Sequence, residues 1–528
     1  MEARARSCSA QGGFGEFAMS HDTQNLTLLG AAQNPASARN PWAALAVLCA
    51  GYGTILLDLT VVNNAMPSII GSLHTGVNGI LWVINAYVLV YAVLLITAGR
   101  VGDLVGQRAI FAGGLALFTV ASALCGFAQT TSQLVAARIL QGVGGALLTP
   151  QTVALVTTIF PPDRRGTAMG MWGAVAGLAT VAGPTLGGFI VTRWDWRWVF
   201  FINVPIGVVI LLATFLLVPD IRFGRRQHLD IGGVALASVG LVLVVFGLIE
   251  GQRFHWGRLW GMLTIPETIG AGLLILTAFL FWERRQKDPL LPFVLFEDRN
   301  FLWMNGMVSA MSFAMLGFSF LLPIYLQSAL GRTAFQAGLT VAPMSLSLMV
   351  LAPFAGRWAD RPQGQYLPAA GLLCFAGSMA LIAWFGNTSA SGLTLAGPMV
   401  LAGLGIACVM PPSTTLAMRS VPPRLAGAAS GVLNTTRQLG GVLGTTAVGA
   451  LLENRLTLAG YEQSVGSVVQ MPPLLRLHFA EAFIPVMRLT LIVPIALLIV
   501  AVAWFLASLA RADGVAPADA PSPEAVEA

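Results

Sequence analysis

The chain has 528 residues, of which 56% are hydrophobic and only 10% are charged, with a mean hydropathy of +0.76 and a net charge of +6. Soluble domains typically carry about 25% charged residues, so this composition argues against a soluble enzyme or binding module. Apolar runs of about 20 residues recur along the chain, and a helix of that length crosses a hydrocarbon core of roughly 30 Å. A membrane β-barrel would instead show short alternating segments. The sequence therefore predicts an all-α, polytopic membrane protein.

Apolar runs bounded by charged or Gly/Pro-rich breaks predict about fourteen spanning helices. Their approximate ranges are 43–66, 80–99, 109–128, 134–157, 168–191, 198–218, 231–249, 265–283, 302–326, 335–356, 367–386, 393–416, 427–451 and 482–508. The region 260–285 gives the weakest signal, because Glu267 lies near the start of that run. We expect a cytoplasmic tail at 1–42, a six-helix bundle at 43–220, two inserted helices with linkers at 221–298, a second six-helix bundle at 299–508 and a disordered tail at 509–528. Either Met1 or Met19 could be the first residue.

The distribution of basic residues predicts the orientation of the spans. With the N-terminus inside, the inner segments hold nineteen Lys and Arg residues and the outer loops hold seven. Basic residues collect on the cytoplasmic side of membrane proteins. We therefore expect a multi-pass protein of the cytoplasmic (inner) membrane with both termini in the cytoplasm. Topology then accounts for the net positive charge, so no nucleic-acid partner is expected.

Motifs of several other protein classes are missing from the sequence. The five cysteines are widely spaced, and the five histidines fall in tails or predicted loops, so neither a disulfide framework nor a metal site is expected. No G-x-x-x-x-G-K-[ST] phosphate loop occurs, which argues against an ATP-driven pump. No nucleophile–base pair sits in a predicted span. We expect no enzyme activity, no cofactor and a monomer.

The two halves of the chain resemble each other. QGVGGALLTP (141–150) aligns with AGLGIACVMP (402–411) at a spacing of 261 residues, and PPDRRGTAMG (161–170) aligns with PPRLAGAASG (422–431) at the same spacing. GRVGD (99–103) aligns with GRWAD (356–360) at a spacing of 257. Ordered matches across three loops indicate two similar six-helix halves separated by two extra helices. Repeats with a site between them near the midplane are a design of membrane transporters.

Five segments together resemble the major facilitator superfamily, and more narrowly its fourteen-span drug:proton antiporters. They are LDLTVVNNAMP (57–67), GRVGDLVGQR (99–108), RILQGVGGALLTP (138–150), GLATVAGPTLGG (177–188) and WRWVFFINVPIG (196–207). The resemblance covers about residues 43–508 and implies the major facilitator fold with drug export driven by protons. Members of that family often carry further acids in their spans, and this chain has few. That difference argues against polycationic substrates.

Asp58 is the main candidate for a proton-coupling site. On a helix it shares a small, partly polar face with Gly51, Thr54, Val61 and Ala65. Burial raises the pKa of a carboxyl group and a nearby cation lowers it, so a group between these influences can load and release a proton. The resemblance implies that Arg138 sets the pKa of this acid. The alternatives are a structural acid for Asp58 and a clamp on backbone carbonyl groups for Arg138.

The matched loops supply candidates for a conformational latch. Asp103 and Asp360 would each lie near a helix start of the opposite half, around Gly427 and Gly166, where the helix dipole favours a carboxylate. Such contacts would hold the halves together on one side and break as they rock. The alternative is ordinary loop charge that sets the topology. The candidate latch residues are Gly99, Arg100, Asp103, Arg108 and Asp360.

The fifth predicted span carries the antiporter motif of the resemblance, which implies a seal against proton leak between the halves. Its residues are Gly177, Gly183, Pro184, Gly187 and Gly188, and small residues of this kind let helices approach closely. A substrate cavity lined by apolar and aromatic residues tolerates varied ligands. The candidates for its lining are Trp82, Asn85, Tyr87, Tyr91, Asn305, Met311 and Arg437, the last of which could meet a substrate anion or hold helix packing.

The leading hypothesis is a proton-coupled antiporter that exports hydrophobic or amphiphilic drugs by alternating access. Its partners would be a small hydrophobic substrate, protons and the lipid bilayer. One alternative is a dedicated exporter of an endogenous metabolite or a self-made antibiotic. A membrane sensor that transports nothing is the alternative from a different class.

Overall fold

The computed structural model describes residues 40–513 apart from 75–76, 222–229, 252–253, 255, 261–262, 287–288, 290, 333, 389 and 459–472. The first helices are α2 (Pro41–Leu73), α3 (Val77–Val105), α4 (Gln107–Phe127), α5 (Thr131–Ile159), α6 (Pro162–Arg193), α7 (Trp198–Phe201) and α8 (Asn203–Leu217). A middle section follows with α9 (Ile231–Glu250), the strands β1 (Arg258–Trp260) and β2 (Leu263–Thr264), and α10 (Ile265–Glu283). The last section holds α11 (Val294–Glu297), α12 (Arg299–Ile324), the π-helical turn η1 (Tyr325–Ala329), α13 (Ala334–Ala359), η2 (Pro362–Tyr366), α14 (Leu367–Phe385), α15 (Gly392–Ala417), η3 (Pro423–Leu425), α16 (Ala426–Leu458) and α18 (Pro473–Asp513).

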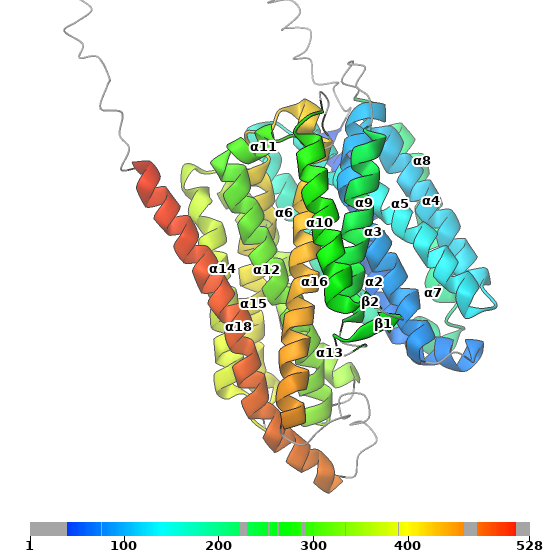
Figure 1. Ribbon diagram of the computed structural model, residues 1–528, viewed down its shortest axis with the longest axis vertical. Coiled ribbons are helices and arrows are strands. Elements are labelled where there is room, and N and C mark those ends of the chain that lie inside the picture. The colour runs from blue at the N-terminus through cyan, green and yellow to red at the C-terminus, as the bar shows by residue number, and fades with distance from the viewer. Residues whose placement is uncertain are drawn as a thin grey trace, which may run out of the picture.

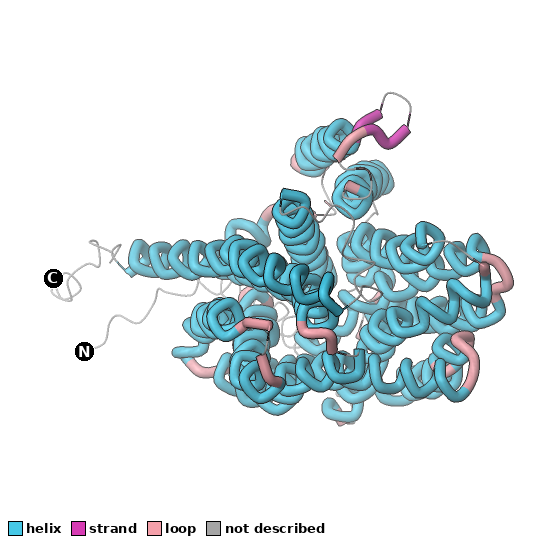
Figure 2. The backbone as a smooth tube through the Cα atoms, turned by 90° about the horizontal axis from the view of Figure 1, so that it is seen from below, coloured by secondary structure: helices cyan, strands magenta, loops and turns pink. Residues whose placement is uncertain are grey.

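The long helices form two bundles that stand side by side (Figure 1). In the first bundle α5 packs on α3 and α4, and α2 packs on α6 and α8; in the second, α15 packs on α13 and α14, and α12 packs on α16. The bundles meet along two seams, α6 against α13 and α3 against α16. The pair α9–α10 lies outside both bundles together with the small β-hairpin, as the end view shows (Figure 2). Two six-helix bundles with two extra helices are the predicted fold class.

Within the described residues, twelve helices are long and apolar enough to cross a membrane, counting α7 and α8 as one span. The two remaining long helices are α6 and α16, which have 32 and 33 residues but are rich in glycine, alanine and threonine. These are the helices that face the other bundle, where small residues allow close packing and lipid contact is not required. With α6 and α16 included, every one of the fourteen predicted spans has a helix at its position.

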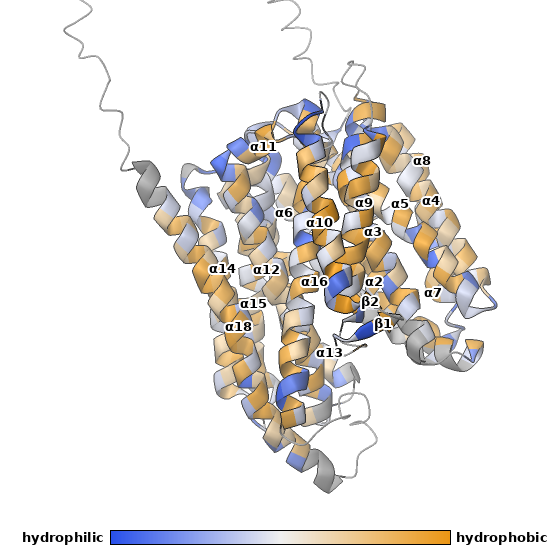
Figure 3. Ribbon diagram, in the orientation of Figure 1, coloured by the Kyte–Doolittle hydropathy of each residue, from blue (hydrophilic) through white to orange (hydrophobic). Residues whose placement is uncertain are grey.

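The outer faces of the helices are apolar and the polar residues collect toward the helix ends (Figure 3). Leu216, Trp384 and Leu393 are 82%, 80% and 89% exposed. Apolar surface on this scale is a liability in water but suits a protein surrounded by hydrocarbon. The pattern agrees with a multi-pass membrane protein.

Glu267, which made the span predicted at 265–283 the least certain, caps the start of a helix. The Thr264 hydroxyl accepts a hydrogen bond from the Glu267 backbone N–H (3.4 Å), and the Glu267 carboxylate accepts one from the Thr264 N–H (2.8 Å). This reciprocal pair is a capping box, which satisfies backbone donors that a helix start leaves free. Glu267 therefore marks the beginning of α10 and is not an acid inside the span.

Several helices run beyond their predicted ends, among them α2, α3, α16 and α18. The spans predicted at 427–451 and 482–508 correspond to α16 (Ala426–Leu458) and α18 (Pro473–Asp513). At 1.5 Å per residue the 41 residues of α18 reach about 61 Å, roughly twice the thickness of a hydrocarbon core. Hydropathy detects only the part of a helix that suits hydrocarbon, so the polar extensions were missed.

Candidate functional site

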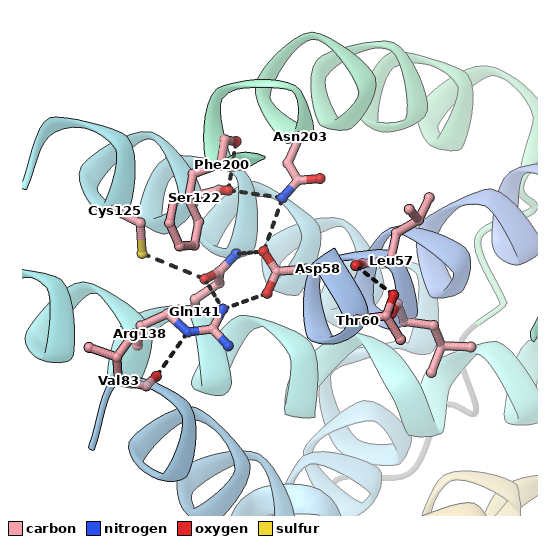
Figure 4. Close-up of polar contacts among 11 residues, drawn as sticks. Leu57, Asp58, Thr60, Val83, Ser122, Cys125, Arg138, Gln141, Phe200 and Asn203 are labelled. Atoms are coloured by element: carbon pink, nitrogen blue, oxygen red, sulfur yellow. Dashed lines mark hydrogen bonds and ion pairs between the residues drawn. The ribbon is translucent and has the colours of Figure 1, made fainter. Parts of the chain in front are cut away.

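A buried ion pair lies at the centre of the first bundle (Figure 4). Arg138 on α5 donates through Nη1 to the Asp58 carboxylate on α2 at 2.5 Å, and both side chains are at most 1% exposed. The other carboxylate oxygen accepts from Gln141 Nε2 at 2.9 Å and from Asn203 Nδ2 at 3.1 Å. Three helices, α2, α5 and α8, thus converge on one carboxylate.

A second set of contacts holds the partners of this pair. Arg138 donates through Nε to the Val83 carbonyl oxygen at 3.2 Å, and its guanidinium lies 4.2 Å from the centre of the Tyr87 ring. Asn203 also donates to the Ser122 hydroxyl at 3.1 Å, and that hydroxyl donates to the Phe200 carbonyl oxygen at 2.9 Å. Helices α3 and α4 therefore orient the groups that bind Asp58.

The electrostatics of the pair depend on both charges being present. A buried ion pair is tolerated only when its geometry is good and the remaining polar atoms are satisfied. Here Asp58 has three donors and Arg138 has two further acceptors, Val83 and the Gln141 side chain (2.7 Å). A proton on Asp58 would remove the charge that balances Arg138.

The two loop aspartates make matching contacts across the seams. Asp103, near the end of α3, accepts hydrogen bonds from the backbone N–H groups of Gly427 and Ala428 in the first turn of α16, both at 2.8 Å. Asp360, after α13, accepts from the N–H groups of Gly166 (2.8 Å) and Thr167 (3.3 Å) near the start of α6. The expected positions near Gly427 and Gly166 are confirmed. We call the end of the molecule that carries these four contacts the gate face.

Glycines let the backbones touch beside these carboxylates. A Cβ on Gly99 would overlap the Gly427 carbonyl oxygen, and a Cβ on Gly356 would overlap that of Gly166. Asp103 is 8% exposed, whereas Asp360 is only partly buried. Partial burial raises the pKa of Asp360 above its ordinary value, against the opposing effect of its two N–H donors. The two seams thus share one geometry and differ in exposure.

The remaining latch candidates do not make the same contact. Arg108 donates to the Val218 carbonyl oxygen at 3.1 Å and lies 3.8 Å from the Asp220 carboxylate, so it fastens α4 to the end of α8 within one bundle. Arg100 is 3% exposed and lines a gate-face cavity of about 560 Å³ together with Arg284 and Arg424. Arg100 therefore stands beside a seam, while Arg108 does not reach the second bundle in the described structure.

The antiporter motif on α6 contacts two different neighbours. Gly177 lies against Ser345 and Leu348 of α13, which belongs to the other bundle. Gly183 and Gly187 lie against Thr60 and Val61 of α2, within the first bundle. The side-chain surroundings of Pro184 and Gly188 lie outside the described part of the structure. The contact between halves thus involves the beginning of the motif, and its sealing role stays a prediction.

A small cavity of about 20 Å³ lies where the bundles meet, and Arg437 reaches it. Its walls come from both bundles, and its lining residues are Val153, Trp172, Val308, Met410, Thr414, Leu433, Asn434 and Arg437. Arg437 donates to the Tyr52 hydroxyl at 3.3 Å, and the Tyr52 ring stacks on Trp172 with centroids 4.4 Å apart. One cation and one aromatic pair therefore face the same small space.

The other six predicted lining residues are not among those that line this cavity. Trp82 packs against Phe246 of α9 at 5.9 Å, and Asn85 is half-buried on α3. Tyr87 covers Arg138, and Tyr91 donates to the Thr149 hydroxyl at 3.1 Å. Asn305 and Met311 are buried, with Asn305 donating to the Phe301 carbonyl oxygen at 3.2 Å. Tyr91 also lies beside Arg437 of the other bundle, whereas Trp82 faces the extra helices.

Sequence reasoning missed several residues that complete both sites. Gln141 lies one turn after Arg138 on the same helix, and Asn203 lies inside the quoted segment WRWVFFINVPIG, so both carried a detectable signal. Tyr52 and Trp172 did not, because nothing in the sequence of either helix indicates which residue of another helix it faces. Only the packing of α2 on α6 places them together.

Two bundles joined by mirrored contacts, with a buried ion pair in one of them, define a membrane transporter. Residues 48–445 match the family model described as Major Facilitator Superfamily, which is well over half of the chain. The chain belongs to the major facilitator superfamily, whose members move small-molecule substrates.

Relatives and solved structures agree with this assignment. The Tetracenomycin C resistance and export protein of Streptomyces glaucescens is 35% identical over 432 residues, covering 81% of this chain and 79% of that protein. The multidrug resistance protein Stp of Mycobacterium tuberculosis is 32% identical over 412 residues, covering 77% and 75%. The structure of a human organic anion transporter matches with a TM-score of 0.61 at 16% identity, covering 87% of this chain and 99% of that one. This last likeness concerns the fold alone.

Proposed function

We propose that the protein is a secondary antiporter that exports hydrophobic or amphiphilic drugs across the cytoplasmic membrane in exchange for protons. Family membership and the relatives named for drug resistance and export support the direction and the kind of cargo. The single observation that carries proton coupling is the buried Asp58–Arg138 pair with its ring of amide and hydroxyl groups. An ionisable group inside a membrane bundle is costly and usually serves a function.

The ion pair suggests how a proton could drive the cycle. When Asp58 takes up a proton, Arg138 loses its counter-charge and keeps only Val83 and Gln141 as acceptors. The contacts between α2 and α5 then weaken, which changes the relative stability of the two conformations. Release of the proton on the other side restores the pair. Gln141 and Asn203 would keep the carboxyl group oriented in both states.

The contacts at the gate face could distinguish two conformations of the transporter, one in which they are formed and one in which they are broken. Its four N–H to carboxylate hydrogen bonds join the bundles in this structure. Hydrogen bonds to charged groups are stronger than neutral ones, so separating the bundles here costs on the order of a few kcal/mol. We infer that Asp103 and Asp360, with Gly99 and Arg100 beside the seam, act as the latch of the state closed on this face. The glycines of the α6 motif would limit proton leak while the bundles rock.

The remaining features of this proposal follow from the sequence. The excess of basic residues at the gate-face loops supports an inner-membrane protein with both termini in the cytoplasm. We propose a monomer with the domain layout 1–42, 43–220, 221–298, 299–508 and 509–528. The protein would act on protons, lipid-soluble cargo and the bilayer, without enzymatic chemistry.

A second candidate is a dedicated exporter of one endogenous metabolite or self-made antibiotic. The relative named for Tetracenomycin C resistance and export favours this possibility. The two candidates differ in breadth, because a multidrug exporter moves unrelated compounds and a dedicated one moves a single scaffold. A panel of unrelated compounds therefore separates them.

The proposal can be tested in inverted membrane vesicles from a bacterial strain that lacks its own major exporters. Respiration acidifies the vesicle interior, and a pH-sensitive dye reports proton release when a substrate is added. The panel contains ethidium, puromycin, a tetracycline and a planar phenolic dye. We expect proton release with at least one compound for the wild-type protein and loss of that release in Asp58→Asn. The matched control is Asp195→Asn, which removes a half-exposed acid from the same bundle.

Each outcome decides a part of the proposal. No proton release with any compound, at confirmed expression, would reject the exporter and leave the sensor. Full proton release in Asp58→Asn would place the coupling site elsewhere. Release with a single scaffold would favour the dedicated exporter.

A further inference from the structure

Arg437 is a cation in the middle of the second bundle that the proposed proton cycle does not use. It lies eleven residues after the start of α16, and Tyr52 lies eleven residues after the start of α2. At 1.5 Å per residue both are about 16 Å from the gate-face ends of their helices, which is near the centre of a hydrocarbon core of roughly 30 Å. The guanidinium therefore stands near the midplane, between the bundles.

The groups around this guanidinium are neutral. Arg437 donates to the Tyr52 hydroxyl at 3.3 Å, and the Tyr91 side chain lies beside it as well. Asn434 and Thr414 supply an amide and a hydroxyl to the same cavity wall. A phenol, an amide and a hydroxyl can accept hydrogen bonds, but none of them balances a full positive charge.

No carboxylate in the described part of the chain is available to Arg437. None lies within 4.0 Å of it, and Asp58 is already paired with Arg138. Along α16 the next acid is Glu453, sixteen residues further on, or about 24 Å away. The sequences of α12, α13, α14 and α15 contain no acid at all. The central space between the bundles thus carries one uncompensated positive charge.

A guanidinium without a counter-charge is costly in an environment of low dielectric constant. Packing alone does not require it, since an apolar or amide side chain would fill the same place without that cost. An anion entering from outside the chain would remove the cost whenever it is bound. Arginine is also well suited to this task, because its planar fork binds carboxylate and similar oxygens through two parallel hydrogen bonds.

The aromatic pair beside the charge indicates the shape of such an anion. Tyr52 and Trp172 stack with an interplanar angle of 20°, and Trp172 lines the cavity with Val153 on the first-bundle side. Val308, Met410 and Leu433 form the apolar wall opposite. Flat aromatic surfaces pack well against rings, and a flexible Met side chain adapts to different outlines.

We propose that Arg437 binds the negative charge of the cargo, and that the exporter carries planar aromatic molecules with one acidic oxygen group, such as a phenolate, an enolate or a carboxylate. This inference rests on the proposed export function and specifies its substrate class. Asp58 and Arg437 then have separate tasks, since the first exchanges the proton and the second recognises the cargo.

The present conformation has no room for such a molecule. A space of about 20 Å³ holds roughly one water molecule. Its walls, however, belong to different bundles, with α5 and α6 on one side and α12, α15 and α16 on the other. Separation of the bundles at the gate face would open this space toward that face, so the cargo would enter from there and reach Arg437 at the midplane.

Three fluorescent tricyclic dyes of similar outline test the inference. Resorufin is a phenolate anion, its methyl ether is neutral, and proflavine is a cation. Export of each is measured in inverted vesicles for the wild type, Arg437→Gln and Arg437→Lys, with Arg488→Gln as the matched control. Arg488 is an exposed arginine of the same bundle that donates to the Gly386 carbonyl oxygen and does not line the cavity. Thermal unfolding of each purified variant checks that it folds.

We expect wild-type protein to export resorufin about tenfold faster than proflavine, because a charge-matched site discriminates strongly against the wrong charge. Arg437→Gln should lower resorufin export by about tenfold and that of the neutral ether by less than about threefold, while Arg437→Lys keeps an intermediate rate. Arg488→Gln should preserve the preference for the anion.

Other results overturn the inference in distinguishable ways. Equal loss of all three dyes in Arg437→Gln would assign the residue to packing. Export of proflavine at the rate of resorufin, or export of ethidium or puromycin that Arg437→Gln leaves intact while no anion is moved, would reject the anionic substrate class and keep the export function. Absence of transport for every compound in the wild-type protein, at confirmed expression, would reject both proposals.

Discussion

The two bundles are alike in backbone but differ in how the charge near their midplane is balanced. In the first, Arg138 is balanced by Asp58 and held by further polar groups. In the second, Arg437 meets a tyrosine hydroxyl and has no carboxylate within reach among the described residues. The position that matches Arg138 at the repeat spacing of 261 is Met399, which is fully buried.

In a duplicated transporter, the fold constrains the contacts at the seams more strongly than the charges near the midplane. The gate-face aspartates and the glycines beside them occur in both halves, because both seams need the same close contact. The midplane charges occur once each, in keeping with the separate tasks proposed for them. Variants that alter the charge balance or the seam contacts of one bundle therefore test this difference.

The largest effect is expected from removing one member of the balanced pair. Arg138→Gln leaves Asp58 as a buried charge without its partner, which lowers the free energy of unfolding by about 3–5 kcal/mol. Arg437→Gln removes an unbalanced charge and should leave the free energy of unfolding unchanged or raise it. Thermal and chemical unfolding of the purified proteins in detergent measures both. Equal losses in the two variants would show that the bundles do not differ in charge balance.

The next largest effect concerns the pair as a unit. The double variant Asp58→Asn with Arg138→Gln has two neutral groups that can bond to each other, so it should recover much of the stability lost in either single variant. A double-mutant cycle is expected to give a coupling free energy of about 2–3 kcal/mol. Proton release should stay absent, because no titratable group remains at this position. Additive losses would contradict direct coupling in the folded state.

An acid placed beside Arg437 should make the second bundle resemble the first. Asn434 lies three residues before Arg437 and lines the same cavity, so Asn434→Asp supplies an internal counter-charge at a spacing that allows contact. We expect resorufin export to fall about tenfold, which corresponds to about 1.4 kcal/mol. Asn434→Leu is the matched control, since it removes the amide without adding charge. A similar loss in both variants would point to packing and not to charge.

The smallest effect is expected at the gate face, where the two seams differ only in exposure. Asp103→Asn should speed hydrogen exchange at the Gly427 and Ala428 amides by about fivefold, since their acceptor loses its charge. Asp360→Asn should speed exchange at Gly166 and Thr167 by about twofold, because Asp360 is more exposed and its bond to Thr167 is longer at 3.3 Å. Mass spectrometry of peptides that cover each helix start gives both rates. A larger effect at Asp360 would reverse the ranking of the seams.

Much of the architecture was predictable because it depends on the hydropathy of successive residues and on the internal repeat, both of which can be read along the sequence. The fourteen helix positions follow from hydropathy, and the placement of Asp103 and Asp360 opposite Gly427 and Gly166 follows from the repeat and a known arrangement of halves. Asp58 was detectable because, among the fourteen spans predicted from hydropathy, no other acid lies more than a few residues from the end of a span. Its proton-coupling role still rests on the proposal above.

The rest depends on how each helix is rotated about its axis, which the sequence of an almost uniformly apolar helix does not specify. Trp82 was expected in the cavity but faces α9, and Arg108 was grouped with the latch but binds the end of α8. Tyr52 and Trp172 were missed for the same reason. The partners of Asp58 also depend on contacts between helices that are distant in the sequence. The motif at 196–207 therefore drew attention to Asn203, but it did not indicate that Asn203 binds Asp58.

The donors of the gate-face contacts are backbone N–H groups, and this has a genetic consequence. Replacing the side chain of Ala428 or Thr167 leaves the donor in place, so mutation can remove these bonds readily only on the aspartate side. A genetic selection for variants that restore transport to a protein held closed at the gate face should therefore yield changes at Asp103 and Asp360. At Gly427 and Gly166 the changes should act through bulk, because any side chain there collides with the opposite bundle. Charge-swap suppressors, which are common where two side chains form an ion pair, should be absent from both seams.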